Sequence, residues 1–187
     1  MNAAESAEKR GPEASQGLSR QAKADRHAPT APQVRILPYE PQYASDFKRL
    51  NAEWIEKDFA LEATDLKMLD HPEEYVLQRG GRILFAEYLG HIVGTCALLR
   101  VDLDTLELAK MAVSATAQGL GIGQRLAQAA LDTARSMSAQ RVYLESNTGL
   151  TAAIHLYYKL GFKKILPARP SPYARVDIQM ELVLAKT

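Results

Sequence analysis

A glycine-rich turn between a predicted strand and a predicted helix constrains this chain most. Gly119, Gly121 and Gly123 alternate with other residues in the stretch 118–124. Because glycine accepts a positive φ and has no Cβ, such a loop lets backbone N–H groups approach a ligand closely. Apolar residues then recur at helical spacing over 122–137, so the loop opens onto a helix N-terminus, where free N–H groups favour an anion. We therefore expect phosphate binding here.

The spacing of these glycines excludes two common phosphate loops. A dinucleotide fingerprint requires G-x-G-x-x-G, but Gln124 and Leu126 stand three residues beyond Gly121 and Gly123. A nucleotide P-loop requires a Gly-Lys pair, and the sequence has none. The pattern that fits is Q-x-x-G-x-G, which begins at Gln118 and follows a strand.

A second pattern lies beyond the next predicted strand. The run from Ala153 to Phe162 has the form A-x-x-L-Y-x-K-x-G-F, with Tyr157 in the tyrosine position. Together, the two motifs resemble those of the GNAT N-acetyltransferase superfamily, in which the glycine loop binds the pyrophosphate of acetyl-CoA. The resemblance covers about 34–187 and is strongest over 106–162.

The resemblance implies an α/β fold: a GNAT-type single domain with a mixed, mostly antiparallel sheet flanked by helices and a parallel strand pair splayed around acetyl-CoA. Hydrophobic periodicity predicts strands at 34–37, 83–89, 92–99, 106–113, 141–146, 162–165 and 174–184. It predicts helices at 42–59, 62–69, 122–137 and from 151. Gly90-His91 is the predicted hairpin turn, and Thr151 is the predicted N-cap of the last helix.

Composition is that of an ordinary globular protein of 187 residues, for which one domain is expected. A net charge of +1 gives no argument for a nucleic acid or membrane partner. The single Cys96 excludes an internal disulfide and, with no apolar leader or spanning segment, favours a cytoplasmic location. Its apolar surroundings predict a buried thiol. Four scattered histidines give no metal-ligand pattern, so no metal is expected.

Residues 1–33 contain only Met1 and Leu18 as large apolar residues, so we expect a disordered N-terminal tail before a folded domain at 34–187. A mitochondrial presequence is the alternative, because Arg and Ser are present. Four acidic residues argue against it: Glu5, Glu8, Glu13 and Asp25. The domain could be a monomer or a homodimer.

Acetyl transfer from a thioester to an amine needs a base, a stabilised oxyanion and a proton for the leaving thiolate. Glu145 is the first candidate for the base, because it interrupts a strand that otherwise reads as buried. Some GNAT members carry a glutamate twelve residues before the signature tyrosine, as Glu145 stands before Tyr157. The alternative for Glu145 is a structural carboxylate paired with an Arg or Lys. Glu107, on the strand before the loop, is the reserve candidate.

Tyr157 is the candidate acid that protonates the coenzyme A thiolate. It shares a helical stripe with Ala153 and Leu160, so its ring should be buried in any role. The alternative is a core aromatic whose hydroxyl bonds to backbone. Tyr158 points about 100° away on the helix. The resemblance places the oxyanion donor at a main-chain N–H near Val113.

The resemblance assigns acetyl-CoA binding to the strand before the loop, to the loop and to the signature helix. The role of Asn147 stays open, because more residues separate it from that helix than in many family members. The expected contacts are Met111, Ala112, Val113, Gln118, Gly119, Leu120, Gly121, Ile122, Gly123, Gln124, Asn147 and Tyr157.

Charged and aromatic residues near both ends of the domain are the candidates for the acceptor site. They are Trp54, Glu62, Asp65, Tyr173 and Arg175, with Arg169 nearby. Opposite charges on two walls would suit a small amino-acid-like acceptor, because a guanidinium binds a carboxylate bidentately and an acidic wall attracts an ammonium group. The alternative for the acidic residues is a solvated helix face. The alternatives for the function are acetylation of a protein N-terminus or lysine, and a non-catalytic acyl-CoA-binding module.

Overall fold

The computed structural model describes residues 33–167 and 170–185. The predicted disordered tail lies outside these residues apart from Gln33, and so does Arg169. Within the described part of the chain, no helix has the length and apolar character needed to cross a membrane. The same residues contain no group of three His, Cys, Asp or Glu side chains that could hold a metal ion.

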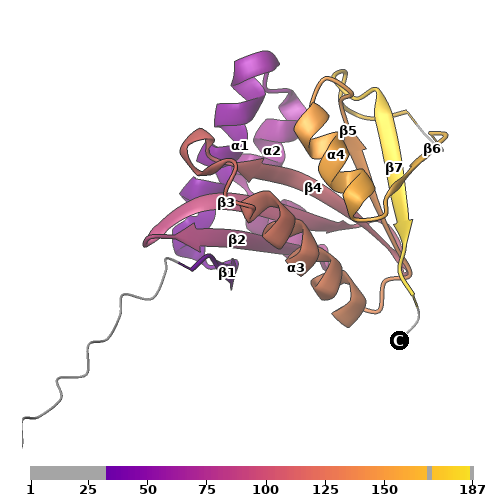
Figure 1. Cartoon of the computed structure of the whole chain (residues 1–187), viewed down its shortest axis with the longest axis horizontal. Coiled ribbons are helices and arrows are strands. Elements are labelled where there is room, and N and C mark those ends of the chain that lie inside the picture. Colours follow the sequence, from indigo (N-terminus) through magenta and orange to yellow (C-terminus); the bar gives the residue numbers. More distant parts are fainter. Residues whose placement is uncertain (1–32, 168–169, 186–187) are drawn as a thin grey trace, which may run out of the picture. The chain divides into compact units, whose positions relative to one another are not determined.

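The strands in the described residues form one mixed sheet in the order β1-β2-β3-β4-β5-β7-β6 (Figure 1). They are β1 (Arg35–Pro38), β2 (Arg82–Tyr88), β3 (His91–Arg100), β4 (Thr105–Val113), β5 (Arg141–Ser146), β6 (Lys163–Ile165) and β7 (Ile178–Val183). Only the neighbours β4 and β5 run parallel in this sheet. A parallel pair needs a crossover, which a helix supplies here. The expected mixed, mostly antiparallel fold is confirmed.

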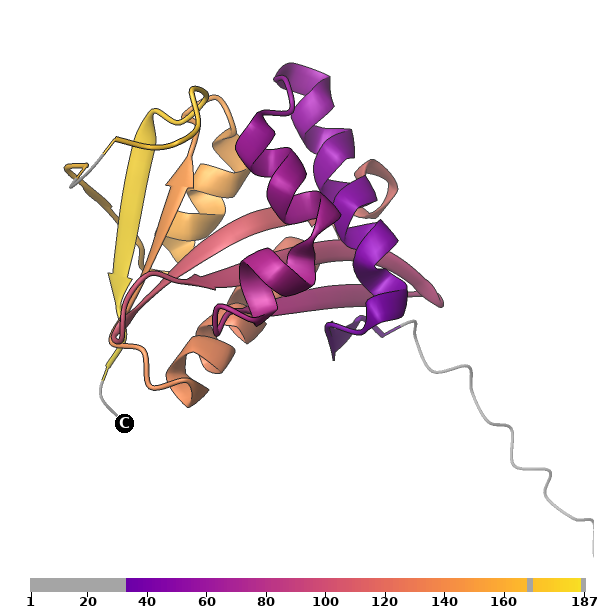
Figure 2. The ribbon, with the colours of Figure 1, turned by 180° about the vertical axis from the view of Figure 1, so that it is seen from behind.

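Helices cover both faces of this sheet. Figure 1 views the side of α3 (Ile122–Ser136) and α4 (Thr151–Lys159). Figure 2 views the side of α1 (Ala44–Asp58) and α2 (Ala63–Asp70). A π-helix at Glu73–Leu77 follows α2 and was not predicted, because a single turn leaves no periodicity to recognise.

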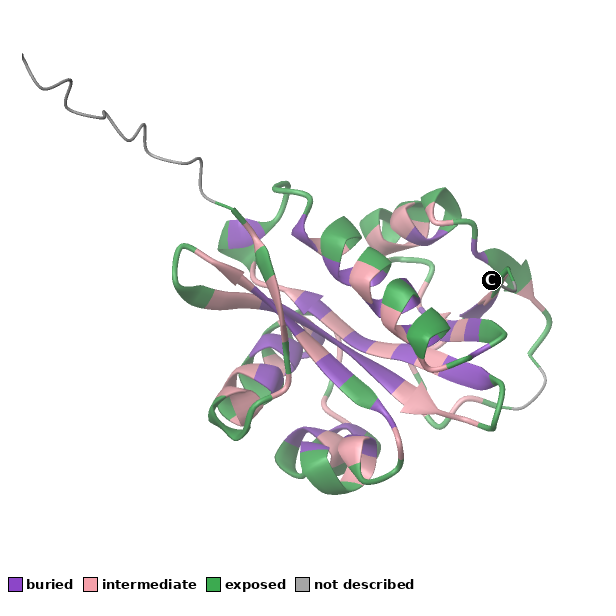
Figure 3. Cartoon of the chain, turned by 90° about the horizontal axis from the view of Figure 1, so that it is seen from below, coloured by how far each residue is buried: buried purple, intermediate pink, exposed green. Residues whose placement is uncertain are grey.

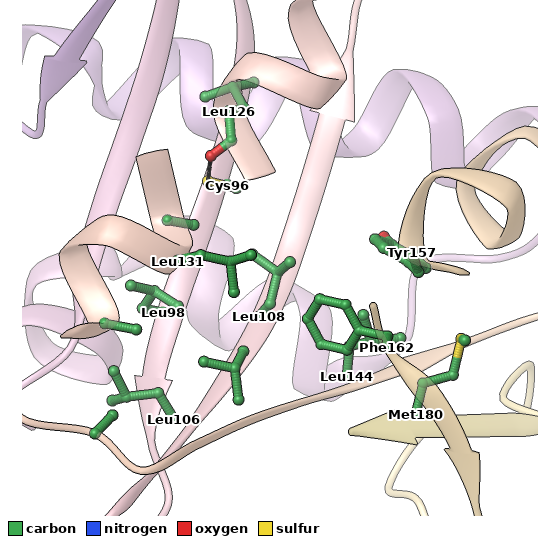
Figure 4. Packing of buried hydrophobic residues seen from close by; sticks show 14 of the residues in the cluster. Cys96, Leu98, Leu106, Leu108, Leu126, Leu131, Leu144, Tyr157, Phe162 and Met180 are labelled. Atoms are coloured by element: carbon green, nitrogen blue, oxygen red, sulfur yellow. Dashed lines mark hydrogen bonds between the residues drawn. The ribbon is translucent and has the colours of Figure 1, made fainter. Parts of the chain in front are cut away.

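Alternation along the strands divides the apolar side chains between two cores, and Figure 3 shows burial concentrated along the strands and the inward faces of the helices. One core lies under α3 and α4 (Figure 4) and includes Leu98, Leu106, Leu108, Leu126, Leu131, Leu144 and Phe162. The other lies under α1 and α2 and includes Phe47, Leu69, Ile83, Phe85 and Ala97. Cys96 is buried as predicted, and burial raises the pKa of its thiol to about 12.

Three local predictions are wrong. The last strand begins at Ile178 and not at Ala174, because Ala174 and Arg175 form a turn. The β2–β3 turn consists of Leu89 and Gly90, with φ of 53° and 78°, while His91 already pairs with Tyr88. Positive φ at both central residues is the geometry that matches the twist of a hairpin, and here a leucine adopts it. Thr151 is the first residue of α4 and not its N-cap, a position that Leu150 occupies without a side-chain hydrogen bond.

Gly81 lies where β2 passes close to neighbouring backbone. A Cβ there would lie 2.4 Å from the carbonyl oxygen of Leu98 and 2.8 Å from that of Val76. We expect Gly81→Ala to lower the free energy of unfolding by about 1–3 kcal/mol, as overpacking does, in a urea titration. Gly123→Ala is the control, because Gly123, like Gly81, has no left-handed φ, and a Cβ there would lie at an ordinary contact distance of 3.5 Å from the nearest atom, in Met111. An equal loss in both variants would contradict the packing explanation.

Candidate functional site

The parallel strands β4 and β5 pair only over their first residues. The paired positions run from Thr105 with Arg141 to Glu107 with Tyr143, and these described strands have no later partners. The strands then part, and a cavity of about 80 Å³ lies between them. We call this cavity the central cavity.

Lys110 interrupts the regular geometry of β4 at this point. Its φ is 52°, in the left-handed region that lysine seldom adopts. Thr95 pairs with Ala112 and Ala97 with Ala109, so β4 has one residue more than β3 over this interval. This is a β-bulge, which bends a strand and redirects its side chains. The bulge therefore lies where β4 parts from β5.

A groove of about 660 Å³ runs past the end of β4, the glycine loop and α4. Gly119 and Gly121 have φ of 80° and 74°, and a Cβ at either would meet no protein atom within 4 Å. Gly123 lies in the first turn of α3, so only two of the three glycines use the freedom that was expected of all three. Gly121 is the N-cap of α3, whose first N–H groups have no partner within the helix. This end of the groove suits a phosphate.

Most residues expected to contact acetyl-CoA line this groove. They are Met111, Ala112, Val113, Gln118, Gly119, Gly121, Ile122, Gly123 and Tyr157. Leu120, Gln124 and Asn147 do not line it. Gln124 accepts a hydrogen bond from Lys159 (2.9 Å), and the Asn147 side chain donates to the carbonyl of Arg175 (2.6 Å), which braces the neighbouring loop. Sequence reasoning missed Lys57 of α1, which also lines the groove and which no motif marks.

Tyr157 lines both the groove and the central cavity. Its side chain packs edge-on against Phe162 (Figure 4), and the residue is only 8% exposed. Its hydroxyl approaches the Met111 sulfur at 3.9 Å. Burial raises the pKa of this hydroxyl to about 12, so it keeps its proton. Tyr158, by contrast, is 51% exposed.

The two candidate bases lie on neighbouring strands beside the central cavity. Glu107 accepts a 2.8 Å hydrogen bond from the hydroxyl of Tyr143, its partner on β5. Glu145 accepts hydrogen bonds from Ser171 Oγ (2.6 Å) and Gln179 Nε2 (2.9 Å). Within the described residues no Arg or Lys pairs with Glu145, so the structural alternative for this carboxylate has no partner there.

Both carboxylates also line a second space, of about 400 Å³, which we call the acceptor cavity. Met68 of α2 and Ser171 and Tyr173 of the segment before β7 are among its other lining residues. Glu107 and Glu145 therefore stand between the acceptor cavity and the central cavity that Tyr157 borders.

The remaining candidates for the acceptor site form one buried network. Lys110 Nζ donates to Asp65 (2.6 Å) and to the Tyr173 hydroxyl (3.0 Å). The Arg175 guanidinium donates to both oxygens of Asp65 (2.7 and 2.8 Å) and to Glu62 (3.0 Å). The expectation that these charges face each other across an open pocket is wrong, because they compensate each other within the protein.

Asp65 is the centre of this network and is fully buried. Burial alone would raise the pKa of its carboxyl, but hydrogen bonds from Arg175 and the charge of Lys110 outweigh burial and lower the pKa. Burial lowers the pKa of Lys110 although Asp65 opposes that shift. Lys110 was missed at the level of sequence, where the only signal was one lysine within an otherwise apolar stretch of strand.

Asp65→Asn should lower the free energy of unfolding by about 3–5 kcal/mol, because it leaves the buried Lys110 without its paired anion and Arg175 with Glu62 alone. Asp70→Asn is the control. It removes an exposed pair with Lys48 (2.6 Å) and should cost at most about 1 kcal/mol. Urea denaturation measures both values.

The lowered pKa of Asp65 also predicts how the free energy of unfolding depends on pH. Because the pKa of Asp65 is lowered on folding, its stabilisation is complete above the ordinary carboxyl pKa and is lost as pH falls through the folded value. Between about pH 7 and pH 3, the wild type should lose more stability than Asp65→Asn. Equal acid sensitivity would contradict the lowered pKa.

Comparison with known proteins places this geometry in a family. Residues 47–162 match the sequence profile of the acetyltransferase (GNAT) family. The chain is 33% identical over 144 residues to the uncharacterized N-acetyltransferase YjgM of Escherichia coli, which covers 74% of this chain and 86% of that protein. It is 31% identical over 113 residues to N-acetyltransferase 8 of Rattus norvegicus, covering 58% of this chain and only 51% of that relative.

Solved structures have the same fold. A GNAT-family acetyltransferase from Staphylococcus aureus superposes with a TM-score of 0.74 at 22% identity, over 82% of this chain and all of that one (100%). yncA of Salmonella typhimurium, solved with acetyl-CoA, gives 0.67 at 18% identity, over 82% and 95%. The profile match and the identity with YjgM show that the chain belongs to the acetyltransferase (GNAT) family, a family of acetyl-CoA-dependent acyltransferases.

Proposed function

We propose that this protein transfers the acetyl group of acetyl-CoA to the primary amine of a small amino-acid-like molecule. The position of Tyr157 carries the proposal, because its buried hydroxyl lies at the junction of the groove and the central cavity. A thioester in the groove and an amine entering from the acceptor cavity would meet beside this hydroxyl. Acetyl-CoA supplies the activated acyl group.

The groove residues would hold the coenzyme through its charged end. The first N–H groups of α3 and the open loop at Gly119 and Gly121 favour the pyrophosphate. Lys57 adds a positive charge to the groove wall. Trp54 of α1 lines both the groove and the central cavity, so α1 would close over the thioester end.

The reaction joins nitrogen to the acetyl carbon and breaks the carbon–sulfur bond. Glu145 would accept a proton from the ammonium form of the amine, directly or through water. It is favoured over Glu107 because it lies beyond the last β4–β5 pair, where the strands have parted, while Glu107 belongs to that pair. Tyr157 would donate its proton to the departing thiolate.

The size of the acceptor cavity supports a small acceptor. Its volume of about 400 Å³ falls within the roughly 300–1,000 Å³ that is usual for small-molecule sites. The ion pair between Arg175 and Asp65 holds the segment before β7 against α2, which limits the width of the acceptor cavity. A protein N-terminus or lysine is the alternative acceptor, and a panel of free amines and peptides assayed for coenzyme A release separates the two.

Tyr157→Phe tests the assignment of the acid, because it keeps the ring and deletes only the hydroxyl. We expect kcat to fall by roughly 100-fold or more, while the acetyl-CoA affinity changes little. The wild-type kcat should show no loss from deprotonation of this group below about pH 11, since its pKa is raised to about 12.

Tyr158→Phe is the matched control, because it removes the hydroxyl of the adjacent exposed residue and should keep full turnover. Wild-type turnover in Tyr157→Phe would reduce Tyr157 to a core aromatic. A wild-type chain that binds acetyl-CoA but acetylates no amine or peptide would instead favour a binding module.

Gly121→Val tests the phosphate site. A side chain at this positive φ strains the loop and occupies the open space where the ligand would lie, so acetyl-CoA affinity should fall by more than about tenfold in calorimetry. Gly90→Val is the control, because Gly90 has a similar φ of 78° and equally open surroundings outside the groove. Unchanged affinity in a folded Gly121→Val protein would remove the loop from the coenzyme site.

A further inference from the structure

We propose that the acceptor carries a carboxylate that binds beside Arg79 and Arg100, with an apolar carbon chain between this carboxylate and the reacting amine. The proposal rests on the proposed function and names the substrate class for the same site. In this proposal Arg79 and Arg100, and not Arg175, bind the carboxylate.

The acceptor cavity adjoins a further space of about 260 Å³ on the side away from β5. Both spaces are lined by Met68, Leu99 and Glu107. Glu107 also borders the central cavity, so one carboxylate faces all three spaces. The three spaces thus form a series that leads away from Tyr157.

Arginines mark the far end of this series. Arg79 and Arg100 line the last space together with Tyr75 and Val101. Arg79 stacks over the Tyr75 ring at 4.8 Å from its centroid, which holds the guanidinium plane. The π-helix positions Tyr75 and Arg79, because Tyr75 lies within it and Arg79 comes shortly after its last residue. Single π turns recur at functional sites.

These arginines have more donors to offer than Arg175, whose guanidinium already makes three hydrogen bonds to Asp65 and Glu62. In the described part of the chain, neither Arg79 nor Arg100 lies within 4.0 Å of a carboxylate. To other described residues, Arg100 donates from Nη1 alone, to the carbonyl oxygens of Asp102 (3.4 Å) and Leu103 (3.2 Å). A guanidinium has five N–H donors, arranged to grip a carboxylate.

Charge and polarity along the series define the ligand. Glu145, which lines the central and acceptor cavities but not the last space, attracts an ammonium group, and the arginines attract an anion at the opposite end. Glu107 borders all three spaces and lies between these ends. Between them, Met68 and Leu99 present apolar surface to the ligand. An amino carboxylic acid with several carbon atoms between its two charged groups satisfies all three parts at once.

The test uses a series of straight-chain amino acids from glycine to aminohexanoate, each compared with the alkylamine in which a methyl group replaces the carboxylate. In the wild type, kcat/KM should favour the longer amino acids over their alkylamines. In Arg79→Gln or Arg100→Gln, the KM for aminohexanoate should rise by about tenfold or more, the usual effect of losing a charge-assisted hydrogen bond. The KM for hexylamine and both kcat values should stay as in the wild type.

Arg82→Gln is the matched control. Arg82 is an exposed neighbour whose guanidinium donates to the Gly81 carbonyl (2.7 Å), and it lines neither space. This variant should leave the aminohexanoate KM unchanged, and urea denaturation confirms that all three variants fold. A rise in KM with Arg82→Gln equal to that with Arg79→Gln would reduce the effect to bulk charge and overturn the proposal.

Calorimetry of aminohexanoate with the coenzyme A-bound protein separates this proposal from the proposed function. Binding that Arg79→Gln weakens, in a protein that acetylates no amine, would support the carboxylate site and overturn the N-acetyltransferase assignment. Alkylamines acetylated as efficiently as their amino acids, or peptides preferred over all of them, would overturn the carboxylate site and leave acetyl transfer intact.

Discussion

The burial of one carboxylate, that of Asp65, holds together parts of the domain that are far apart in the sequence. Asp65 on α2 binds Lys110 in the β4 bulge and Arg175 in the segment before β7. Removing Asp65 would leave the buried Lys110 without its paired carboxylate, so the contact among these three elements depends on this one side chain. The acceptor cavity lies between α2 and that segment, and its walls therefore depend on this charge balance.

The sequence predicts the parts of the site that depend on the spacing of neighbouring residues along the chain. The glycine loop, α3 and the signature helix each follow from spacing within a few turns, which is why Gly121 and Tyr157 line the groove as expected. The candidate bases were predicted because a carboxylate in an apolar strand is conspicuous. Register and side-chain direction in β4 and β5 then bring Glu107 and Glu145 to one cavity.

The parts that sequence did not predict depend on contacts between distant segments. Lys110 reads as a strand residue, and neither its positive φ nor its partner Asp65 follows from local pattern. The charged acceptor candidates were assigned to opposite walls, because a sequence shows charges without showing which of them pair. The π-helix is a single turn whose shape depends on packing against β2 and β3, and the arginine that follows it went unnoticed for the same reason.

The parting of β4 and β5 divides the sheet into two half-sheets that share only three registered residue pairs. Strands in a continuous sheet satisfy each other's N–H and C=O groups, and here the facing edges beyond Glu107 and Tyr143 do not. An extended ligand between these edges would contact both strands and so connect the two half-sheets. Ligand binding should then stabilise the contact between the two half-sheets, because a molecule that binds only the folded state adds its binding free energy to the free energy of unfolding.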